Sequence, residues 1–395
     1  MFRLFCYGQE IVKNDLTLES YTMKICYILT RSDAIGGVQI HVRNFSKMMN
    51  EKMHNAHILV GGKGSYFQHL ADEGHNVQSI KFLRKNINPI YDLLALFEII
   101  IFLKKIKPEI VSTHSSKAGV LGRLASKILG IPVIFTAHGW AFTEGVGRAK
   151  QIFYSKIETF MSIMTDHIIT VSNYDLDLAL EKKITQKHRI QSIHNGMPEI
   201  SKKFISEISS DRIKICMVAR FDAQKDHMTL LTSLAEIKDL SWDIDFLGDG
   251  PLVDSIKRYT EQLGIEDRVN FFGQVSNVKV FLRESQIFAL ISNWEGLPRS
   301  IIEAMRSGLP IVASDVAGVK ELIDDGINGY LIPRKDSKTL SKRMRSLIID
   351  EELRMKMAKE SLKKYQEGFT LERTFDKTFA VYKETIEIKK ENSNG

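Results

Sequence analysis

Cysteine is scarce in this chain, which has only Cys6, Cys26 and Cys216 among its 395 residues. Their wide spacing provides neither a disulfide framework nor the closely paired ligands of a zinc site, and it is typical of a reducing cytoplasm. No run approaches the roughly 18 apolar residues of a membrane-spanning helix. The first residues also lack the basic and then apolar pattern of a secretory signal. The sequence therefore predicts a cytoplasmic protein without a spanning helix.

Several signatures of nucleotide and metal sites are missing as well. The loop at residues 30–38 lacks the G-x-G-x-x-G fingerprint of a dinucleotide site and the acidic residue that follows it, which disfavours an NAD-dependent oxidoreductase. Residues 61–65 lack the spacing of a P-loop. Asp243 and Asp245 imitate a metal-binding Asp-x-Asp motif, but both lie within a strand pattern. We therefore expect no metal site.

The bulk composition is that of a globular protein, with 44% hydrophobic and 26% charged residues. Residues 23–200 carry 22 Lys and Arg against 14 Asp and Glu, whereas residues 201–395 carry 31 of each. A basic first half suits an anionic membrane surface or an anionic acceptor, although a generally basic proteome would give the same bias. We expect no nucleic-acid partner.

Strand-like apolar runs alternate with helical patterns, which predicts parallel sheets covered by helices. The length allows two domains, each with its own core. We expect an extension outside the core over residues 1–22, with Met23 as the functional start, and a first domain over residues 23–200. A second domain follows over residues 201–375. The expected strands lie near residues 24–30, 56–60, 76–80, 109–113, 132–136, 167–171, 190–194, 213–218, 242–247, 268–272, 287–291 and 310–314.

The most informative segment reads WEGLPRSIIEAM, from Trp294 to Met305. Pro298 suits the first position of a short amphipathic helix that Gly308 ends, so Glu295 precedes the helix and Glu303 lies inside it. Free N–H groups at the helix start can hold a phosphate, and Gly296 lets it come close. Two carboxylates flanking a phosphate can bind the hydroxyl groups of a nucleotide sugar. A capped surface helix with incidental glutamates is the alternative.

A second cluster follows the expected strand 213–218. Arg220 and Lys225 lie in the loop after this strand, where α/β folds bind anionic ligands, and together they could neutralise a diphosphate. Asp226 is expected to cap the next helix. A solvated turn is the alternative interpretation.

The segment around Trp294 resembles the retaining glycosyltransferases of family 4, which have the GT-B fold. The match continues through residues 310–323 and ends with GINGYLI at residues 326–332. The resemblance implies that Glu295 meets the donor hexose and Glu303 the nucleotide ribose. It also implies that the donor diphosphate is held by Arg220, Lys225 and the helix start at Gly296, Leu297 and Pro298.

In the first half, the resemblance places Gly36 and Gly37 near the donor phosphates and His138 at the donor sugar. His138 ends an expected strand, on the side of a sheet that faces the cleft. The alternatives are a plain tight turn and a structural histidine. His114, Ser116 and Lys117 are candidates for the acceptor, because the start of helix 116–129 could receive its phosphate.

The resemblance predicts a GT-B fold of two Rossmann-like domains with parallel sheets facing across a central cleft, and a last helix, residues 376–395, that returns to the first domain. It predicts transfer of a hexose or N-acetylhexosamine from a UDP-linked donor, without a metal or cofactor, to a lipid-linked sugar for a surface polysaccharide. The protein would lie at the inner face of the cell membrane. The apolar stretch 93–103, followed by lysines, fits membrane contact or, more simply, core packing. A UDP-sugar hydrolase or epimerase, or a non-catalytic nucleotide-sugar binder, is the alternative function.

Overall fold

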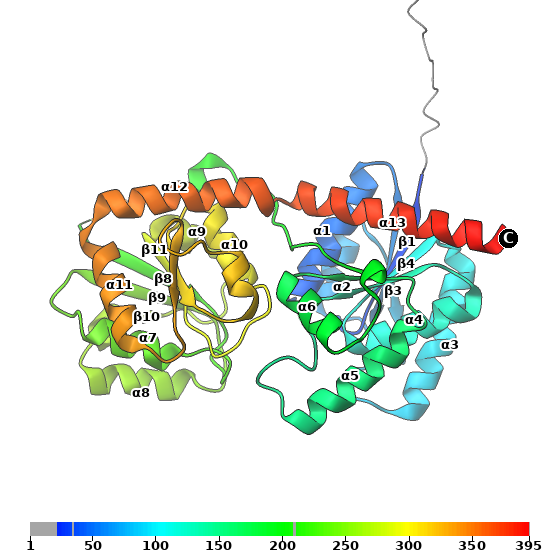
Figure 1. Ribbon diagram of the computed structural model, residues 1–395, viewed down its shortest axis with the longest axis horizontal. Helices are drawn as coiled ribbons and strands as arrows, with labels where there is room; N and C mark the ends of the chain where they lie inside the picture. Colours follow the sequence, from blue (N-terminus) through cyan, green and yellow to red (C-terminus); the bar gives the residue numbers. More distant parts are fainter. Residues whose placement is uncertain (1–21, 34, 208–210, 395) are drawn as a thin grey trace, which may run out of the picture.

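The computed structural model describes residues 22–33, 35–207 and 211–394, so nearly all of the expected extension, residues 1–21, lies outside the described residues. Two parallel sheets form two lobes that stand side by side (Figure 1). The described residues thus have the GT-B architecture that the sequence predicted. Among them, no helix has the combined length and apolar character needed to cross a membrane.

The first sheet has the order β3-β2-β1-β4-β5-β6-β7. Its strands are β1 (Lys24–Leu29), β2 (Asn55–Gly61), β3 (Asn76–Ile80), β4 (Ile110–His114), β5 (Val133–Ala137), β6 (His167–Thr170) and β7 (Ile190–Ser192). The helices between them are α1 (Gly37–Glu51), α2 (Ser65–Asp72), α3 (Pro89–Ile106), α4 (Ser116–Leu129), α5 (Arg148–Ser162) and α6 (Asn173–Glu181).

The second sheet has the order β10-β9-β8-β11-β12-β13. Its strands are β8 (Ile213–Val218), β9 (Trp242–Leu247), β10 (Val269–Phe271), β11 (Ile287–Leu290), β12 (Ile311–Ser314) and β13 (Gly329–Ile332). The helices are α7 (His227–Ala235), α8 (Val253–Leu263), α9 (Val278–Glu284), α10 (Arg299–Arg306), α11 (Ser337–Ile349), α12 (Glu351–Gly368) and α13 (Leu371–Asn394).

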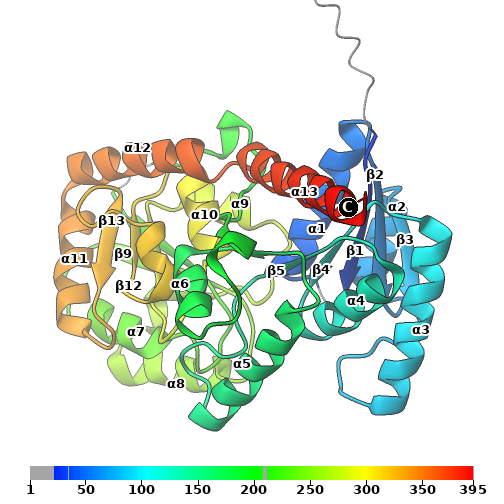
Figure 2. The ribbon, with the colours of Figure 1, turned by 45° about the vertical axis from the view of Figure 1, so that its right-hand side comes forward.

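Side chains of β1 point alternately to the two faces of the first sheet, and both faces are covered by helices. Ile25 and Tyr27 belong to a core cluster with residues of α1 and α13, whereas Cys26 and Ile28 belong to a cluster with residues of α3 and α4. Successive side chains of a strand point to opposite faces, so a strand that is apolar throughout needs helices on both sides. Figures 1 and 2 accordingly show α13 on one side of this sheet and α3, α4 and α5 on the other.

The strand order reverses beside β1 in one sheet and beside β8 in the other, because neighbours on the two sides come from opposite directions along the chain. Such switch points open a crevice at the carboxyl ends of the strands, where α/β proteins bind their ligands. The loops after β1, β4 and β5 and those after β8 and β11 are therefore the places to look for a site.

Some local expectations need correction. The strand β13 was missed, and the last helix, expected over residues 376–395, begins at Leu371, after a break in the helical pattern at Phe369 and Thr370. The helix α10 begins at Arg299, with Pro298 as its N-cap instead of its first residue. Asp226 does cap α7, as expected, by accepting a hydrogen bond from the Thr229 N–H.

The Asp-x-Asp segment lies within β9, as the strand pattern indicated. Asp243 pairs with Arg212, and Asp245 is buried and accepts a hydrogen bond of 2.9 Å from the side-chain amide of Asn270. Both carboxylates are therefore engaged in packing the second sheet.

Candidate functional site

The donor side of the site is built from the loops that follow β8 and β11. The backbones of Lys225 and Ser292 form an antiparallel bridge that joins these two loops. Lys225 Nζ pairs with Oε1 of Glu295, which also accepts a hydrogen bond of 2.6 Å from Ser292 Oγ. The side chains are only 11% and 6% exposed, so each charge compensates the other in a buried setting. The structure thus brings Lys225 and Glu295 into direct contact.

Arg220 stands apart from this pair. Its guanidinium is 73% exposed and pairs with Asp222 at 3.0 Å, so little holds it in one orientation. At the start of α10, Leu297 is buried and Pro298 is the N-cap. A Cβ atom built on Gly296 would meet no atom within 4 Å, so packing alone does not require glycine there. The space beside Gly296 is open to a ligand.

Glu303 lies on α10 between Arg299 and Arg306. Burial raises the pKa of the Glu303 carboxyl, and the positive charges of the two arginines act against that shift. All three side chains line a cavity of about 610 Å³ between the domains, a size typical of small-molecule sites. Arg43 of α1 and Lys279 of α9 add positive charge to its lining. The cavity therefore suits an anionic ligand.

Gly36 and Gly37 lie at the start of α1, and Gly37 is close to Arg299 of the cavity lining. A Cβ atom built on Gly37 would lie 2.8 Å from Cδ of Arg299, closer than side chains pack, so the missing side chain lets the two domains approach. Gly36 is the N-cap of α1, and a Cβ atom there would meet only Oε1 of Gln39, at 3.3 Å. The two glycines thus differ: Gly37 makes the domain contact, and Gly36 faces open space.

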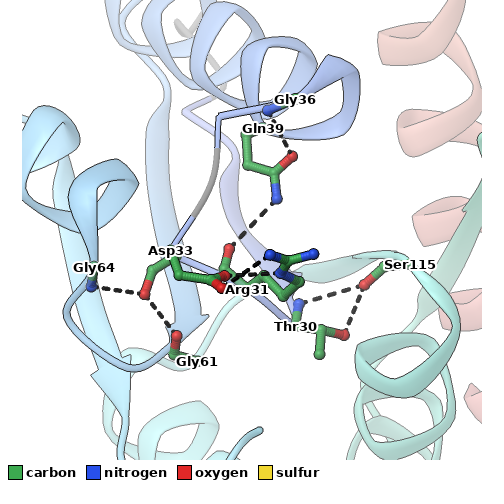
Figure 3. Close-up of polar contacts among 9 residues, drawn as sticks. Thr30, Arg31, Asp33, Gly36, Gln39, Gly61, Gly64 and Ser115 are labelled. Carbon is green, nitrogen blue, oxygen red and sulfur yellow. Dashed lines mark hydrogen bonds and ion pairs between the residues drawn. The ribbon is translucent and has the colours of Figure 1, made fainter. Parts of the chain in front are cut away.

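The loop between β1 and α1 is held by polar contacts at the carboxyl ends of three strands (Figure 3). The Thr30 N–H donates to Ser115 Oγ at 3.3 Å, and the two hydroxyl oxygens are 2.8 Å apart. Ser32 Oγ donates to the carbonyl of Gly61 at 2.7 Å and accepts from the N–H of Gly64 at 2.9 Å. These contacts hold residues 30–32, which follow β1, against the ends of β2 and β4.

Three histidines gather at the carboxyl edge of the first sheet. His114 ends β4, His138 follows β5, and His41 lies in α1 with its ring 5.0 Å from that of His138. Nδ1 of His114 is 2.9 Å from Nε2 of His138. Burial lowers the pKa of His138 to about 3, with help from the charge of Arg299, and burial also lowers the pKa of the other two. All three rings are neutral at pH 7, and His138 is the partly exposed one.

The nitrogen atoms of these histidines lie within 4.8 Å of one another, and no other such group of potential metal ligands occurs among the described residues. Two of the nitrogens already share a hydrogen bond, and the charge of Arg299 acts on His41 and His138. A metal ligand needs a free lone pair, and a nearby cation repels a second one. The cluster fits a hydrogen-bonded network better than a metal centre.

The acceptor candidates are placed differently from one another. His114 is fully buried, and its Nε2 lies 3.1 Å from Ser112 Oγ, so both ring nitrogens are engaged. Lys117 Nζ contacts Asp92 Oδ1 at 2.5 Å. Ser116, the first residue of α4, is exposed. Of the three, Ser116 alone offers an unobstructed side chain, and His114 reaches the cleft only through His138.

A second contact between the domains was not anticipated from the sequence. Glu321, at the end of the short helix η4 (Ala317–Glu321), accepts hydrogen bonds from the N–H groups of Asn173 and Tyr174 at 2.8 and 2.9 Å, and it pairs with His194 at 2.5 Å. Burial acts to raise the pKa of Glu321, but the hydrogen bonds outweigh it and lower the pKa. A carboxylate at the start of α6 also complements the helix dipole.

Sequence reasoning also missed Arg299 and His41. Arg299 is the first residue of α10, where a positive charge is unfavourable because it opposes the helix dipole. An arginine at that position of the motif could therefore have indicated a role in binding instead of in helix stability. His41 lies one turn into α1, after Gly37, and thus on the helix face that the glycine presents to the cleft. The spacing of four residues between Gly37 and His41 could therefore have indicated that His41 faces the cleft.

Comparison with known proteins shows which family the chain belongs to. The family "Glycosyltransferase Family 4" matches residues 35–199, and "Glycosyl transferases group 1" matches residues 199–364. The chain is 28% identical over 365 residues to the Escherichia coli UDP-Gal:alpha-D-GlcNAc-diphosphoundecaprenol alpha-1,3-galactosyltransferase, covering 88% of this chain and 94% of the relative. It is 30% identical to an uncharacterized 41.2 kDa protein in the cps region of Klebsiella pneumoniae, covering 68% and 77%.

Among solved structures, Anabaena Alr3699/HepE in complex with UDP superposes with a TM-score of 0.80 at 18% identity, covering 92% of this chain and 100% of that one. The likeness shows the shared GT-B fold. With both halves matched and a relative at 30% identity, the chain belongs to the family 4 glycosyltransferases. It is a glycosyltransferase, as the motif around Trp294 predicted.

Proposed function

We propose that this glycosyltransferase moves a hexose or N-acetylhexosamine from a UDP-sugar to a lipid-linked sugar during assembly of a surface polysaccharide. The observation that carries the proposal is the cavity between the domains, where Glu303 lies among Arg43, Arg299 and Arg306. Guanidinium groups bind phosphate oxygens strongly, and a carboxylate can accept hydrogen bonds from ribose hydroxyls. The name of the Escherichia coli relative, with its UDP-Gal donor and diphosphoundecaprenol acceptor, supports both substrate classes.

The chemistry follows from where positive charge is fixed. When the bond from the anomeric carbon to the phosphate oxygen breaks, negative charge grows on the departing UDP. Lys225, Arg299 and the free N–H groups at the start of α10 would stabilise that charge without reorganising. Because these groups can supply the positive charge that a metal ion supplies elsewhere, we propose a reaction that needs no metal.

Retention at the anomeric carbon is the second part of the proposal. Oε1 of Glu295 is occupied by Lys225 and Ser292, and Oε2 accepts a hydrogen bond of 3.2 Å from Gln224. A carboxylate whose oxygens are both engaged is a weak nucleophile, which disfavours a covalent sugar–enzyme intermediate at Glu295. We propose that the acceptor hydroxyl attacks on the face that the phosphate leaves, and that a phosphate oxygen takes its proton.

The outer surface of the first domain supports peripheral attachment to the inner face of the cell membrane. On α3, a stripe of apolar side chains is exposed at helical spacing, and a further set is exposed on α5. They are Ile90, Leu94, Phe97 and Ile101 on α3, and Ile152, Phe153 and Phe160 on α5. The opposite face of α3 packs into the core, so the expectation of core packing and that of an exposed apolar surface both apply to it. Lysines at the end of α3 would contact anionic headgroups.

The test is a transfer assay with purified protein, a panel of UDP- and GDP-sugars, and lipid extract from the source cell. Product lipids are identified by mass spectrometry, and released nucleotide is counted. Addition of one sugar mass to a lipid, with one UDP-linked donor, is the expected result. Release of nucleotide at the same rate without lipid would instead identify a hydrolase, and an altered sugar still bound to UDP would identify an epimerase.

Variants locate the donor site. Glu303→Gln and Lys225→Met remove one charge each from the proposed donor contacts and should reduce turnover at least tenfold, the loss of about 1.4 kcal/mol. The exposed ion pair of Lys214 with Glu284, on the same domain, provides Lys214→Met and Glu284→Gln as matched controls. Activity of Glu303→Gln or Lys225→Met equal to that of its control would refute the donor assignment.

A further inference from the structure

A chain of buried polar groups leads from the last helix to His138. The Tyr382 hydroxyl of α13 lies 3.2 Å from Ser112 Oγ on β4. Ser112 Oγ lies 3.1 Å from Nε2 of His114, and Nδ1 of His114 lies 2.9 Å from Nε2 of His138. Tyr382, Ser112 and His114 are at most 1% exposed, so water does not interrupt the chain.

The protons in this chain can be assigned by counting donors. A neutral imidazole carries one proton, and a hydroxyl donates one. With Tyr382 donating to Ser112, the Ser112 proton is given to Nε2 of His114. The His114 proton is then on Nδ1 and is donated to Nε2 of His138.

The opposite direction fails at Ser112. If His138 donated to His114 and His114 donated to Ser112, the serine would accept from both sides. Because Tyr382 donates to Ser112 in the observed geometry, the serine's own proton would then be left without an acceptor, in a fully buried position. Leaving a buried donor unpaired costs about 1–3 kcal/mol. The first direction is therefore the stable one.

We propose that Tyr382, Ser112 and His114 are positioning residues that hold His138 as the Nδ1–H tautomer, so that His138 serves the transfer reaction as a neutral hydrogen-bond donor. The proposal rests on the proposed function for the role of His138, but not for its tautomer. Nε2 of His138 accepts from His114, which leaves the Nδ1 proton as the ring's only donor. That proton can be given to an oxygen of the donor sugar or its phosphate.

The proposal gives α13 a task beyond covering the first sheet. The helix belongs to the end of the chain, yet its Tyr382 hydroxyl sets the protonation pattern three side chains away, at the site. We call the hydrogen-bonded chain from Tyr382 through Ser112 and His114 to His138 the relay. The relay does not need His138 to become charged, which agrees with the burial of His138 and with the nearby charge of Arg299.

The test uses the full-length protein labelled with ¹⁵N-histidine, and long-range ¹H–¹⁵N spectra that distinguish the two tautomers. The His138 signals are identified by their absence in His138→Gln. Tyr382→Phe removes one hydroxyl and leaves the ring in the core. Tyr66→Phe is the matched control, since Tyr66 is also buried and its hydroxyl donates at 2.8 Å to the carbonyl of Gln39, outside the relay.

In the wild type we expect the Nδ1–H form of His138 alone. Tyr382→Phe should shift part of the His138 population to Nε2–H and reduce kcat roughly fivefold, the value of one net hydrogen bond, while KM for the UDP-sugar stays the same. Ser112→Ala should give a larger mixture. An Nε2–H tautomer in the wild type, or an unchanged tautomer and kcat in Tyr382→Phe, would overturn the relay. If the wild type transfers no sugar, the proposed function fails, and the spectra still decide the tautomer.

Discussion

The contact of Gly37 with Arg299 gives a prediction in which stability and activity move independently. Gly37 opens α1 without a positive φ, so alanine fits its backbone, and the helix gains up to about 1 kcal/mol from the substitution. The new Cβ atom, however, would lie 2.8 Å from Cδ of Arg299 on the other domain. Arg299 cannot easily give way, because its Nη2 contacts Met197 Sδ at 3.2 Å and its side chain lies beside Glu303.

The size of the effect can be worked from this overlap. Adding one carbon to a packed contact costs about 1–3 kcal/mol. Here the protein can avoid the cost by separating its domains, so the cost appears as a shift away from the arrangement in which Gly37 and Arg299 are in contact. That shift corresponds to roughly a 5- to 150-fold rise in KM for the UDP-sugar, since 1.4 kcal/mol is a factor of ten. The melting temperature should not fall.

Small-angle scattering and donor kinetics test the prediction. Gly37→Ala should have a larger radius of gyration than the wild type, and saturating UDP should reduce the difference. Gly36→Ala is the control for domain spacing, because its Cβ would reach only Oε1 of Gln39, on its own domain. Unchanged scattering and KM in Gly37→Ala, or equal expansion in Gly36→Ala, would refute the role of Gly37 in domain approach.

Three further results are expected. Glu321→Gln should increase the distance between the domains in scattering experiments, since it removes the charge that holds α6 and His194. The pKa of Glu321 is lowered in the folded protein, so its contact is fully present above the ordinary carboxyl range and is lost only as the pH falls through the lowered pKa. Scattering of the wild type should therefore be constant from pH 6 to 8. Replacing Phe97 and Ile101 by Ser should weaken flotation with anionic vesicles at least tenfold, whereas Ile349→Ser, an equally exposed change on the second domain, should not. With the pKa of His138 at about 3, the profile of kcat against pH should show no rise between pH 5 and 7, and a limb there that disappears in His138→Gln would contradict its neutral state.

The sequence could predict the fold because apolar strands alternate with amphipathic helices over most of the chain. It failed where a strand is short and begins with glycine, as in β13, and where one helical pattern hides a break, as between α12 and α13. At that break, the Thr370 backbone pairs with Met197, which lies between β7 and β8, and a Cβ atom on Gly196 would lie 2.1 Å from the Thr370 carbonyl oxygen. Because this contact joins segments far apart in the chain, no local sequence pattern predicts the break between α12 and α13.

The candidate donor-side residues could be proposed from the sequence for a similar reason. Lys225 and Glu295 lie in loops, and Glu303 in the helix α10, whose positions follow from the strands before them. The neighbours across the cleft could not be derived, because the approach of Gly37 to Arg299, and of Glu321 to α6, depends on how two separate domains are oriented. The histidine network required knowledge of the packing inside the first domain, since His41 of α1 reaches His138 after β5.

The position of α13 also bears on the order in which this protein can fold during its synthesis. Phe375, Tyr382 and Ile386 share a core with Ile25 and Tyr27 of β1, although they leave the ribosome only after the whole second sheet has been made. Until then, the part of this face that α1 does not cover stays open while the second domain is being made. A fragment that ends near residue 200 would keep that part exposed. The two halves of the chain are therefore not independent modules, and a gene encoding the first half alone should yield an aggregation-prone product.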